Sequence, residues 1–174
     1  MAGVRFVLGV HAHQPVGNFP EVFSEAYRRS YVPFLDVLSE FPQIPFAYHI
    51  SGVLFDWLEQ AHPEYLDRLA GLIARGQLEL LTGGYYEPIV AAIPDADKVG
   101  QIERMTAYLK RRFGVTARGM WLAGRVWEPH LAKPLAEAGV EYVILDDNHF
   151  RSAGLSDEAL TGYYLTEEQG ASLA

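Results

Sequence analysis

The sequence predicts an α/β protein in which parallel β/α units form an incomplete part of a larger barrel. Short apolar runs alternate with segments of helical periodicity, and the connections between them are short, as in parallel β/α architectures. Because five predicted strands are too few to close such a barrel, we expect residues 1–174 to form an open α/β half, a fragment of a larger (β/α) barrel.

The predicted strands are short runs rich in β-branched and aliphatic residues. In parallel β/α proteins, functional side chains gather where the strands end, so the residues that follow each run are the candidates for a site. The predicted strands are Val4–Val10, Pro45–Ile50, Leu78–Thr82, Gly119–Leu122 and Glu141–Leu145.

The predicted helices carry apolar residues three and four positions apart. Pro33 predicts a break or kink in the first of them, and Pro134 lies awkwardly inside the last. The residues after Asp146 are polar and contain glycine, and we predict no element there. The predicted helices are Glu21–Phe41, Gly52–Ala61, Pro63–Arg75, Asp95–Phe113 and Pro129–Ala138.

The composition excludes several classes of function. The chain has 174 residues, of which 49% are hydrophobic, and a net charge of −8 without clustered Lys and Arg. Nucleic acid and anionic membranes require clustered basic residues, so we expect neither as a partner. The absence of Cys excludes disulfides and thiolate chemistry. No apolar run approaches the roughly 20 residues of a membrane span or resembles a signal peptide, and we expect a cytoplasmic protein.

Two histidines follow the first predicted strand, and one carboxylate lies inside the third. His11 and His13 share one face because side chains alternate along a strand, so they could bind a metal or a polar ligand, or form a buried hydrogen-bonded pair. Glu79 lies between two leucines. A carboxylate in an apolar strand is costly unless it is paired, which favours a functional role over an outward-facing edge position.

Aromatic and charged residues follow the later predicted strands. Glu87 could serve as an acid in a site or cap the next turn. Glu128 could favour a helix N-terminus, and Asp146 and Asp147 could meet a substrate or cap a loop. The other candidates are Tyr85, Tyr86, Trp121, Arg125 and Trp127.

Histidines, carboxylates and many aromatic rings at strand ends point to a sugar or another polyhydroxylated ligand. Aromatic residues make up 13% of the chain, and the apolar face of a pyranose lies flat on an aromatic ring. No glycine-rich nucleotide fingerprint and no Gly-x-Ser-x-Gly elbow is present.

Three ordered motifs resemble those of family 57 glycoside hydrolases, most closely the 4-α-glucanotransferase and α-amylase-like members. They are HAHQPVGNF at His11–Phe19, GQLELLTGGYYEPIVAAIP at Gly76–Pro94 and WLAGRVWEP at Trp121–Pro129. The similarity continues through EAGVEYVILDDNHFRSAGLS and GYYLTEE, and so covers nearly the whole chain.

The resemblance implies a seven-stranded (β/α) barrel, of which residues 1–174 form the N-terminal portion. It also implies a retaining mechanism on α-1,4-glucans, with no cofactor and no metal. It implies that His13 and Glu79 line the subsite for the sugar to be cleaved, that His11 assists them, and that Trp121 and the nearby tyrosines shape the cleft. Family members use a Glu nucleophile in the third motif and an Asp acid/base in a fourth, held ~5–5.5 Å apart for retaining chemistry. The fourth motif is absent from these 174 residues.

The third motif departs from the family at the expected nucleophile, where this chain has Gly124. The glutamate could have been replaced, the protein could be a natural relative without catalysis, or Glu128 could stand in. The last is disfavoured, because a shift of four positions moves the carboxylate by several ångströms and catalytic geometry tolerates about 0.5 Å. Loss of a covalent nucleophile removes several orders of magnitude in rate.

Three functions therefore follow as hypotheses. The first is an α-glucan-acting hydrolase or 4-α-glucanotransferase that binds maltooligosaccharides and is impaired as written. The second is a non-catalytic carbohydrate-binding relative. The third is a metal-dependent deacetylase or α-mannosidase-like enzyme with His11 and His13 as ligands, since imidazole suits zinc and related ions.

Overall fold

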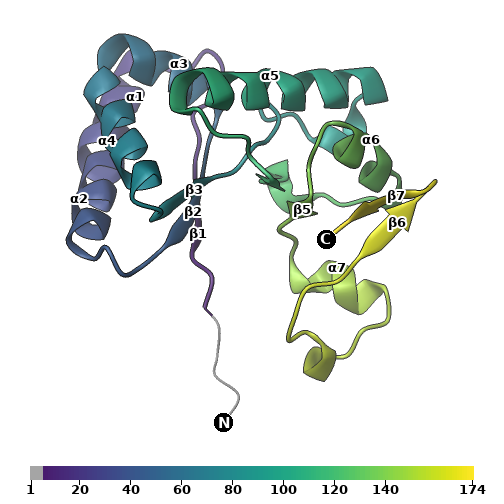
Figure 1. Cartoon of the computed structure of the whole chain (residues 1–174). Coiled ribbons are helices and arrows are strands. Elements are labelled where there is room, and N and C mark those ends of the chain that lie inside the picture. The colour runs from purple at the N-terminus through teal and green to yellow at the C-terminus, as the bar shows by residue number, and fades with distance from the viewer. Residues whose placement is uncertain (1–5) are drawn as a thin grey trace. The chain divides into compact units, whose positions relative to one another are not determined.

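The computed structural model describes residues 6–174, which form two compact units divided between Leu81 and Thr82. The helices and strands of the first unit appear in chain order in Figure 1. They are β1 (Gly9–Ala12), α1 (Pro20–Ala26), a π-helix (Tyr27–Tyr31), α2 (Val32–Glu40), β2 (Phe46–Ile50), α3 (Gly52–Ala61), α4 (Pro63–Ala74) and β3 (Leu78–Leu80).

The second unit contains shorter elements. Its helices are α5 (Asp95–Phe113), α6 (Ala132–Glu137) and α7 (Asp147–Ser152). Its strands are β4 (Gly119–Met120), β5 (Tyr142–Val143), β6 (Thr166–Glu168) and β7 (Ala171–Leu173). Single 3-10 turns span Val90–Ala92, Ala123–Arg125, Pro129–Leu131 and Asp157–Ala159.

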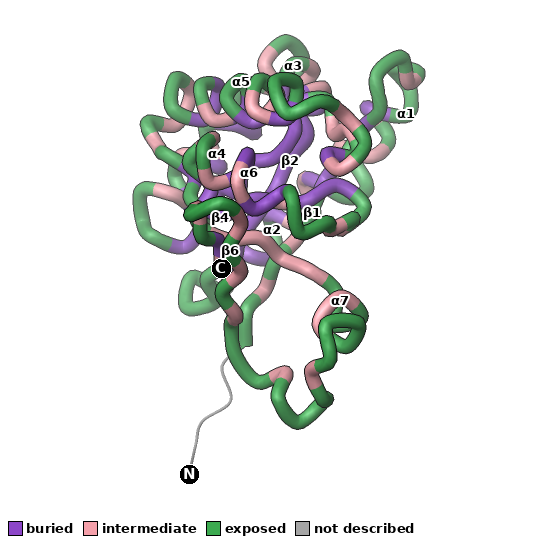
Figure 2. The backbone as a smooth tube through the Cα atoms, turned by 90° about the vertical axis from the view of Figure 1, so that its right-hand side faces the viewer, coloured by how far each residue is buried: buried purple, intermediate pink, exposed green. Residues whose placement is uncertain are grey.

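The first unit is a parallel sheet of order β1-β2-β3 with helices packed on one face. Phe46 and Tyr48 point to that face, where both rings contact Phe34 of α2 and the Tyr48 hydroxyl lies 3.4 Å from that of Tyr65 in α4. The central strand β2 is buried along its length (Figure 2). The opposite face of this sheet carries the histidines.

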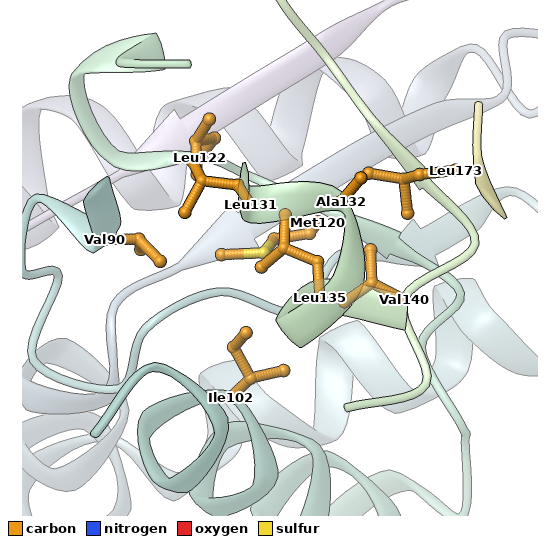
Figure 3. Packing of buried hydrophobic residues seen from close by; sticks show 9 residues of the cluster. All are labelled: Val90, Ile102, Met120, Leu122, Leu131, Ala132, Leu135, Val140 and Leu173. Carbon is orange, nitrogen blue, oxygen red and sulfur yellow. The ribbon is translucent and has the colours of Figure 1, made fainter. Parts of the chain in front are cut away.

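The second unit has a parallel pair, β4-β5, extended by a parallel bridge between Thr82 and Met120, and an antiparallel hairpin, β6-β7. Its core combines residues of α5, β4, α6 and β7 in one apolar cluster (Figure 3). The cluster is Val90, Ile102, Met120, Leu122, Leu131, Ala132, Leu135, Val140 and Leu173. The strands of this unit are short, and the cluster joins them to α5 and α6.

The expected fold class is confirmed: both units contain parallel β/α elements, the second also contains the antiparallel hairpin β6-β7, and the described residues contain no closed barrel. The predicted bounds of Gly52–Ala61 and Asp95–Phe113 agree with α3 and α5. The first predicted helix is interrupted, as expected near Pro33, by the π-helix Tyr27–Tyr31. Proline has no backbone N–H to donate to the preceding turn, and the backbone widens just before it.

Several predicted bounds are wrong. The strand expected at Val4–Val10 is Gly9–Ala12, because pairing with β2 begins only at Gly9 opposite Ala47; Val4 and Arg5 lie outside the described residues. The third, fourth and fifth strands are each shorter than predicted.

The segment from Pro129 was also predicted as one helix. It divides into a 3-10 turn and the α-helix α6. Pro134 then falls in the first turn of α6, where a missing N–H costs no hydrogen bond.

The region after Asp146 holds α7 and the β6-β7 hairpin, which were not predicted. Gln169 and Gly170 connect the hairpin with φ values of 50° and 84°. Two consecutive positive φ angles define the tight turn that suits the twist of a hairpin, usually as Asn-Gly or Asp-Gly. The turn was not predicted because its first residue is glutamine rather than asparagine or aspartate. Among residues 6–174, no helix combines the length and apolar character that crossing a membrane requires.

Candidate functional site

The open face of the first unit's sheet gathers three histidines and a glutamate. In the strand register His11 lies beside His49, and Gly9, Ala47 and Glu79 form the preceding row on the same face. Side chains of parallel strands in register point to one side and alternate with period two. His11, His49 and Glu79 therefore share this face, and His13 follows two positions beyond His11. We call His11, His13 and His49 the histidine face.

The three imidazole rings lie close together. His11 Nδ1 lies 2.9 Å from His49 Nδ1, with ring centroids 5.0 Å apart and planes 25° from parallel. The His11 and His13 rings are 6.0 Å apart at 24°. Burial, and then the neighbouring imidazoles, hold the pKa of His49 well below its ordinary value, and burial lowers the pKa of His13. Neutral imidazole both donates and accepts hydrogen bonds, as sugar hydroxyls require.

Glu79 shares the face but not the position of the histidines. It is exposed in β3, two strands from β1 and level with Gly9. Its Cα therefore lies roughly 16 Å from that of His13, given ~3.3 Å per residue and ~4.8 Å per strand. The two side chains would flank a ligand rather than touch one atom of it.

A buried glutamine anchors the loop that follows β1. Gln14 Nε2 donates to the Tyr31 hydroxyl at 2.9 Å, and its backbone N–H donates to Ser51 Oγ at 3.3 Å. Asn18 Nδ2 donates to Gln14 Oε1 at 2.6 Å. These bonds fix the backbone next to His13. Gln14, Tyr31 and Ser51 were not among the predicted site residues, because their pairing joins segments distant in the chain.

The loop after β3 in the second unit is held by helix α5. Gln101 accepts from the Tyr86 N–H through its side chain at 3.0 Å and from the Tyr85 N–H through its carbonyl at 3.3 Å. The Arg104 guanidinium lies 4.4 and 4.9 Å from the two tyrosine ring centroids. Tyr85 is buried, whereas Tyr86 is 42% exposed. Of these two tyrosines, Tyr86 presents a ring that a sugar could contact.

Glu87 follows these tyrosines with a φ of 52°, a backbone conformation that non-glycine residues rarely adopt. Burial raises the pKa of Glu87 to about 7. A carboxyl group with this pKa exchanges a proton near neutral pH, as a general acid or base does. The next turn begins after Ile89, so Glu87 is not its N-cap residue.

Gly124 and Arg125 both have left-handed backbones, with φ values of 63° and 51°. The Arg125 Nε donates to Asp146 Oδ1 at 2.5 Å, and its guanidinium lies 5.8 Å from the Trp121 ring centroid. The His149 Nε2–H donates to the Arg125 carbonyl at 2.8 Å. These contacts hold the loop after β4 in place.

The other predicted candidates are Asp147, Trp127, Glu128 and position 124, and their surroundings differ. Asp147 pairs with Arg151 at 3.5 Å. Trp127 packs against the core cluster and lines a cavity of about 500 Å³. Glu128 is exposed and precedes the 3-10 turn at Pro129. Position 124 offers no carboxylate, and a Cβ there would lie 3.3 Å from Ile89 Cδ1.

Each unit thus gathers its own candidates. The first brings together His11, His13 and, farther along the same face, Glu79. The second holds Tyr86 by a hydrogen bond to Gln101 of α5, and Arg125 beside Trp121. Sequence reasoning missed His49, although it predicted the strand that carries it. Alternation within that strand, together with its pairing beside β1, was the available signal.

Comparison with known proteins gives consistent matches over nearly the whole chain. The profile of "Glycosyl hydrolase family 57" matches residues 7–174. The chain is 54% identical over 171 residues to "Alpha-amylase 1" of Dictyoglomus thermophilum, covering 98% of this chain and 25% of that protein. It is 52% identical over 170 residues to the "4-alpha-glucanotransferase" of Thermococcus litoralis, covering 98% and 26%.

Solved structures agree with these matches. The crystal structure of the Thermococcus litoralis 4-alpha-glucanotransferase superposes with a TM-score of 0.96 at 51% identity, covering 99% of this chain and 27% of that one. A family 4 carbohydrate esterase from Bacillus anthracis, 16% identical with a TM-score of 0.59 over 79% of this chain and 57% of that one, shares the fold alone. The chain spans about a quarter of the length of the curated relatives that it matches.

Proposed function

Because the chain belongs to glycosyl hydrolase family 57, we propose that it is the N-terminal portion of the (β/α) barrel domain of an α-glucan-acting hydrolase or 4-α-glucanotransferase. Its substrates would be starch, glycogen or maltooligosaccharides. The observation that carries this proposal is identity of 52–54% over 98% of the chain to an α-amylase and a 4-α-glucanotransferase.

The binding chemistry would come from the side chains described above. On the first unit, His11 and His13 would exchange hydrogen bonds with sugar hydroxyls, and Glu79 would accept from a hydroxyl farther along the same face. On the second unit, Tyr86 and Trp121 would offer ring faces to pyranose rings, and Arg125 would order the loop beside them. Tyr85 and Trp127, which are packed into their surroundings, would support this surface rather than contact sugar directly.

Catalysis would be lost in the chain as written, since retaining chemistry needs a carboxylate to attack the anomeric carbon. Gly124 stands at the position where the family resemblance places that carboxylate. No cofactor or metal enters the proposal. We expect residues 1–174 to bind maltooligosaccharide without cleaving or rearranging it.

A chimera tests the assignment. Residues 1–174, with Gly124 or with Gly124→Glu, replace the matching segment of the Thermococcus litoralis 4-alpha-glucanotransferase, to which the chain is 52% identical. Rearrangement of maltooligosaccharides is then measured by product analysis. We expect the Gly124→Glu chimera to be active and the Gly124 chimera to be slower by several orders of magnitude.

The two chimeras share every residue except one, so each is the control of the other. A folded Gly124→Glu chimera without activity on α-glucan would refute the proposed function. Equal activity of both chimeras would show that position 124 does not carry the nucleophile. A third chimera, Gly124→Gln, matches the size of glutamate without its charge and should remain inactive.

A non-catalytic carbohydrate-binding role is the second candidate, and glycine at position 124 is the observation that favours it. Binding of maltooligosaccharide without turnover by the Gly124→Glu chimera would support this role. The third hypothesis, a metal-dependent enzyme with His11 and His13 as ligands, requires stoichiometric metal in the purified protein. Elemental analysis decides it.

The proposal also includes the cellular setting expected from the sequence. We propose a cytoplasmic protein that meets neither nucleic acid nor membrane. Fractionation of the source cells tests its location, and retention of the chain by DNA or by anionic vesicles would contradict the expected absence of such partners.

A further inference from the structure

We propose that His49 is a positioning residue that holds the ring and the tautomer of His11 for sugar binding. The part that concerns sugar rests on the proposed function, whereas the part that concerns the two rings does not. His49 lies in β2, the central strand of its sheet, directly beside His11 in the register.

The contact between the two rings requires complementary tautomers. Their Nδ1 atoms lie 2.9 Å apart, within the range of a hydrogen bond. A neutral imidazole carries a proton on one nitrogen and a lone pair on the other. One ring must therefore be protonated at Nδ1 and the other at Nε2, so the tautomer of His49 fixes that of His11.

The burial of the two rings separates their roles. His49 is 0% exposed, and β2 is buried along its length (Figure 2), whereas His11 is exposed on the open face of the sheet. A ligand on that face meets His11 and not His49. The influence of His49 on binding that we propose passes through the ring of His11, which His49 contacts.

A buried imidazole inside an otherwise apolar strand also needs a partner. The neighbours of His49 in β2 are Tyr48 and Ile50, both buried. Burying a polar group without a hydrogen bond costs free energy, and the His11 Nδ1 supplies a bond. The same bond leaves His11 to address a ligand through the Nε2 side of its ring, and the tautomer decides whether that nitrogen donates or accepts.

The hydrogen bond between the rings is directly measurable. In 15N-labelled protein, nuclear magnetic resonance detects scalar coupling across an N–H···N bond, and long-range 1H–15N spectra report each tautomer. We expect coupling between the two Nδ1 atoms, with one ring protonated at Nδ1 and the other at Nε2. Absence of coupling, or the same tautomer in both rings, would overturn the inference.

Two variants separate the bond from the bulk of the side chain. His49→Leu removes the bond and replaces the imidazole with an apolar side chain of similar size. His49→Asn instead keeps a polar atom near the position of Nδ1. We expect His49→Leu to weaken maltoheptaose binding about tenfold in calorimetry, the worth of one buried hydrogen bond, and His49→Asn to weaken it about threefold or less. His62→Leu, which removes an imidazole between α3 and α4, should leave affinity unchanged.

The binding measurement and the resonance measurement test different parts of the inference. A folded His49→Leu variant that binds maltoheptaose as tightly as the parent would refute positioning by His49. If the parent binds no maltooligosaccharide but shows the coupling, and His49→Leu alters the His11 tautomer or its chemical shifts, the role of His49 toward His11 stands and the proposed function fails. Thermal unfolding of each variant establishes that the protein is folded before either comparison.

Discussion

The two units hold their candidate residues by different means. In the first unit, His11, His49 and Glu79 lie on strands, and the register of β1-β2-β3 sets their spacing. In the second unit, Tyr86, Glu87 and Arg125 lie on loops with left-handed residues, and side chains of α5 and of the segment near α7 contact these loops. The register of a sheet rests on many backbone hydrogen bonds, whereas the position of each loop rests on a few side-chain contacts.

The largest expected effect tests the connection between α2 and β2 in the first unit. Gln77 is buried, and its Nε2 donates to the carbonyls of Leu38, Phe41 and Ile44 at 2.9–3.1 Å. Gln77→Leu leaves these carbonyls without that donor, and we expect the free energy of unfolding to fall by about 3 kcal/mol. Denaturant unfolding measures it.

The matched variant Gln77→Glu keeps the shape of the side chain but removes the donor and buries a charge. Because Arg75 Nε donates to Gln77 Oε1 at 2.8 Å and would pair with the new carboxylate, Gln77→Glu should destabilise about as much as Gln77→Leu. A loss below about 0.5 kcal/mol in both variants would mean that this loop does not depend on Gln77.

The next effect concerns the tyrosine loop of the second unit. A Cβ on Gly84 would lie 2.7 Å from Pro88 Cδ, closer than real contacts allow. Gly84→Ala should therefore cost about 2 kcal/mol of unfolding free energy through overpacking. Gly100→Ala in α5, where a Cβ meets nothing within 4 Å, should instead stabilise by about 0.5–1 kcal/mol, as alanine does inside a helix. Equal effects of the two substitutions, measured by thermal unfolding, would contradict the close contact.

A smaller effect is expected at Gly124. Its φ of 63° lies in the left-handed region, and Ile89 Cδ1 would have to move by a few tenths of an ångström for a Cβ. Gly124→Glu should lower the free energy of unfolding by about 1–2 kcal/mol, and Gly124→Asn by less, because asparagine tolerates this conformation. A Gly124→Glu variant as stable as the parent would indicate that this loop adopts another conformation when it carries a side chain.

The smallest expected effect is the dependence of the free energy of unfolding on pH. Because the pKa of His49 is held below its ordinary value near 6.5, the unfolded chain takes up a proton below pH 6.5 that the folded chain does not. Stability should therefore fall with decreasing pH in this range, by up to about 1.4 kcal/mol per pH unit. Urea unfolding between pH 7 and 5 should show that the free energy of unfolding depends less steeply on pH in His49→Asn than in the parent. The dependence that remains in the variant is due in part to His13, whose pKa is also lowered. The same pH dependence in the parent and in His49→Asn would mean that a group other than His49 causes it.

In both units the sequence predicts the bounds of helices better than those of strands, for physical reasons. The bounds of α3 and α5 follow from local signals, namely apolar periodicity and, for α5, the glycine after its last residue. Strand lengths do not, because β1 begins only where β2 offers a partner and β4 ends after two residues. Pairing between distant segments decides both.

The same distinction applies to the candidate site. His11, His13 and Glu79 could be proposed because alternation along strands places them on a face. Gln101, Arg104 and His149 could not be proposed from the sequence. The side chain of each contacts a loop that is 15 to 24 residues away in the chain. Nothing in the local sequence marks a glutamine as the residue that holds Tyr86.

The central claim is that the histidine face binds α-glucan and that the chain, with glycine at position 124, does not turn it over. Titration of residues 1–174 with maltoheptaose, followed through the imidazole resonances of His11 and His13, tests it most directly. The account predicts saturable shifts of both rings and an unchanged sugar after prolonged incubation. Unmoved imidazole resonances, or the appearance of shorter or longer glucans, would contradict it.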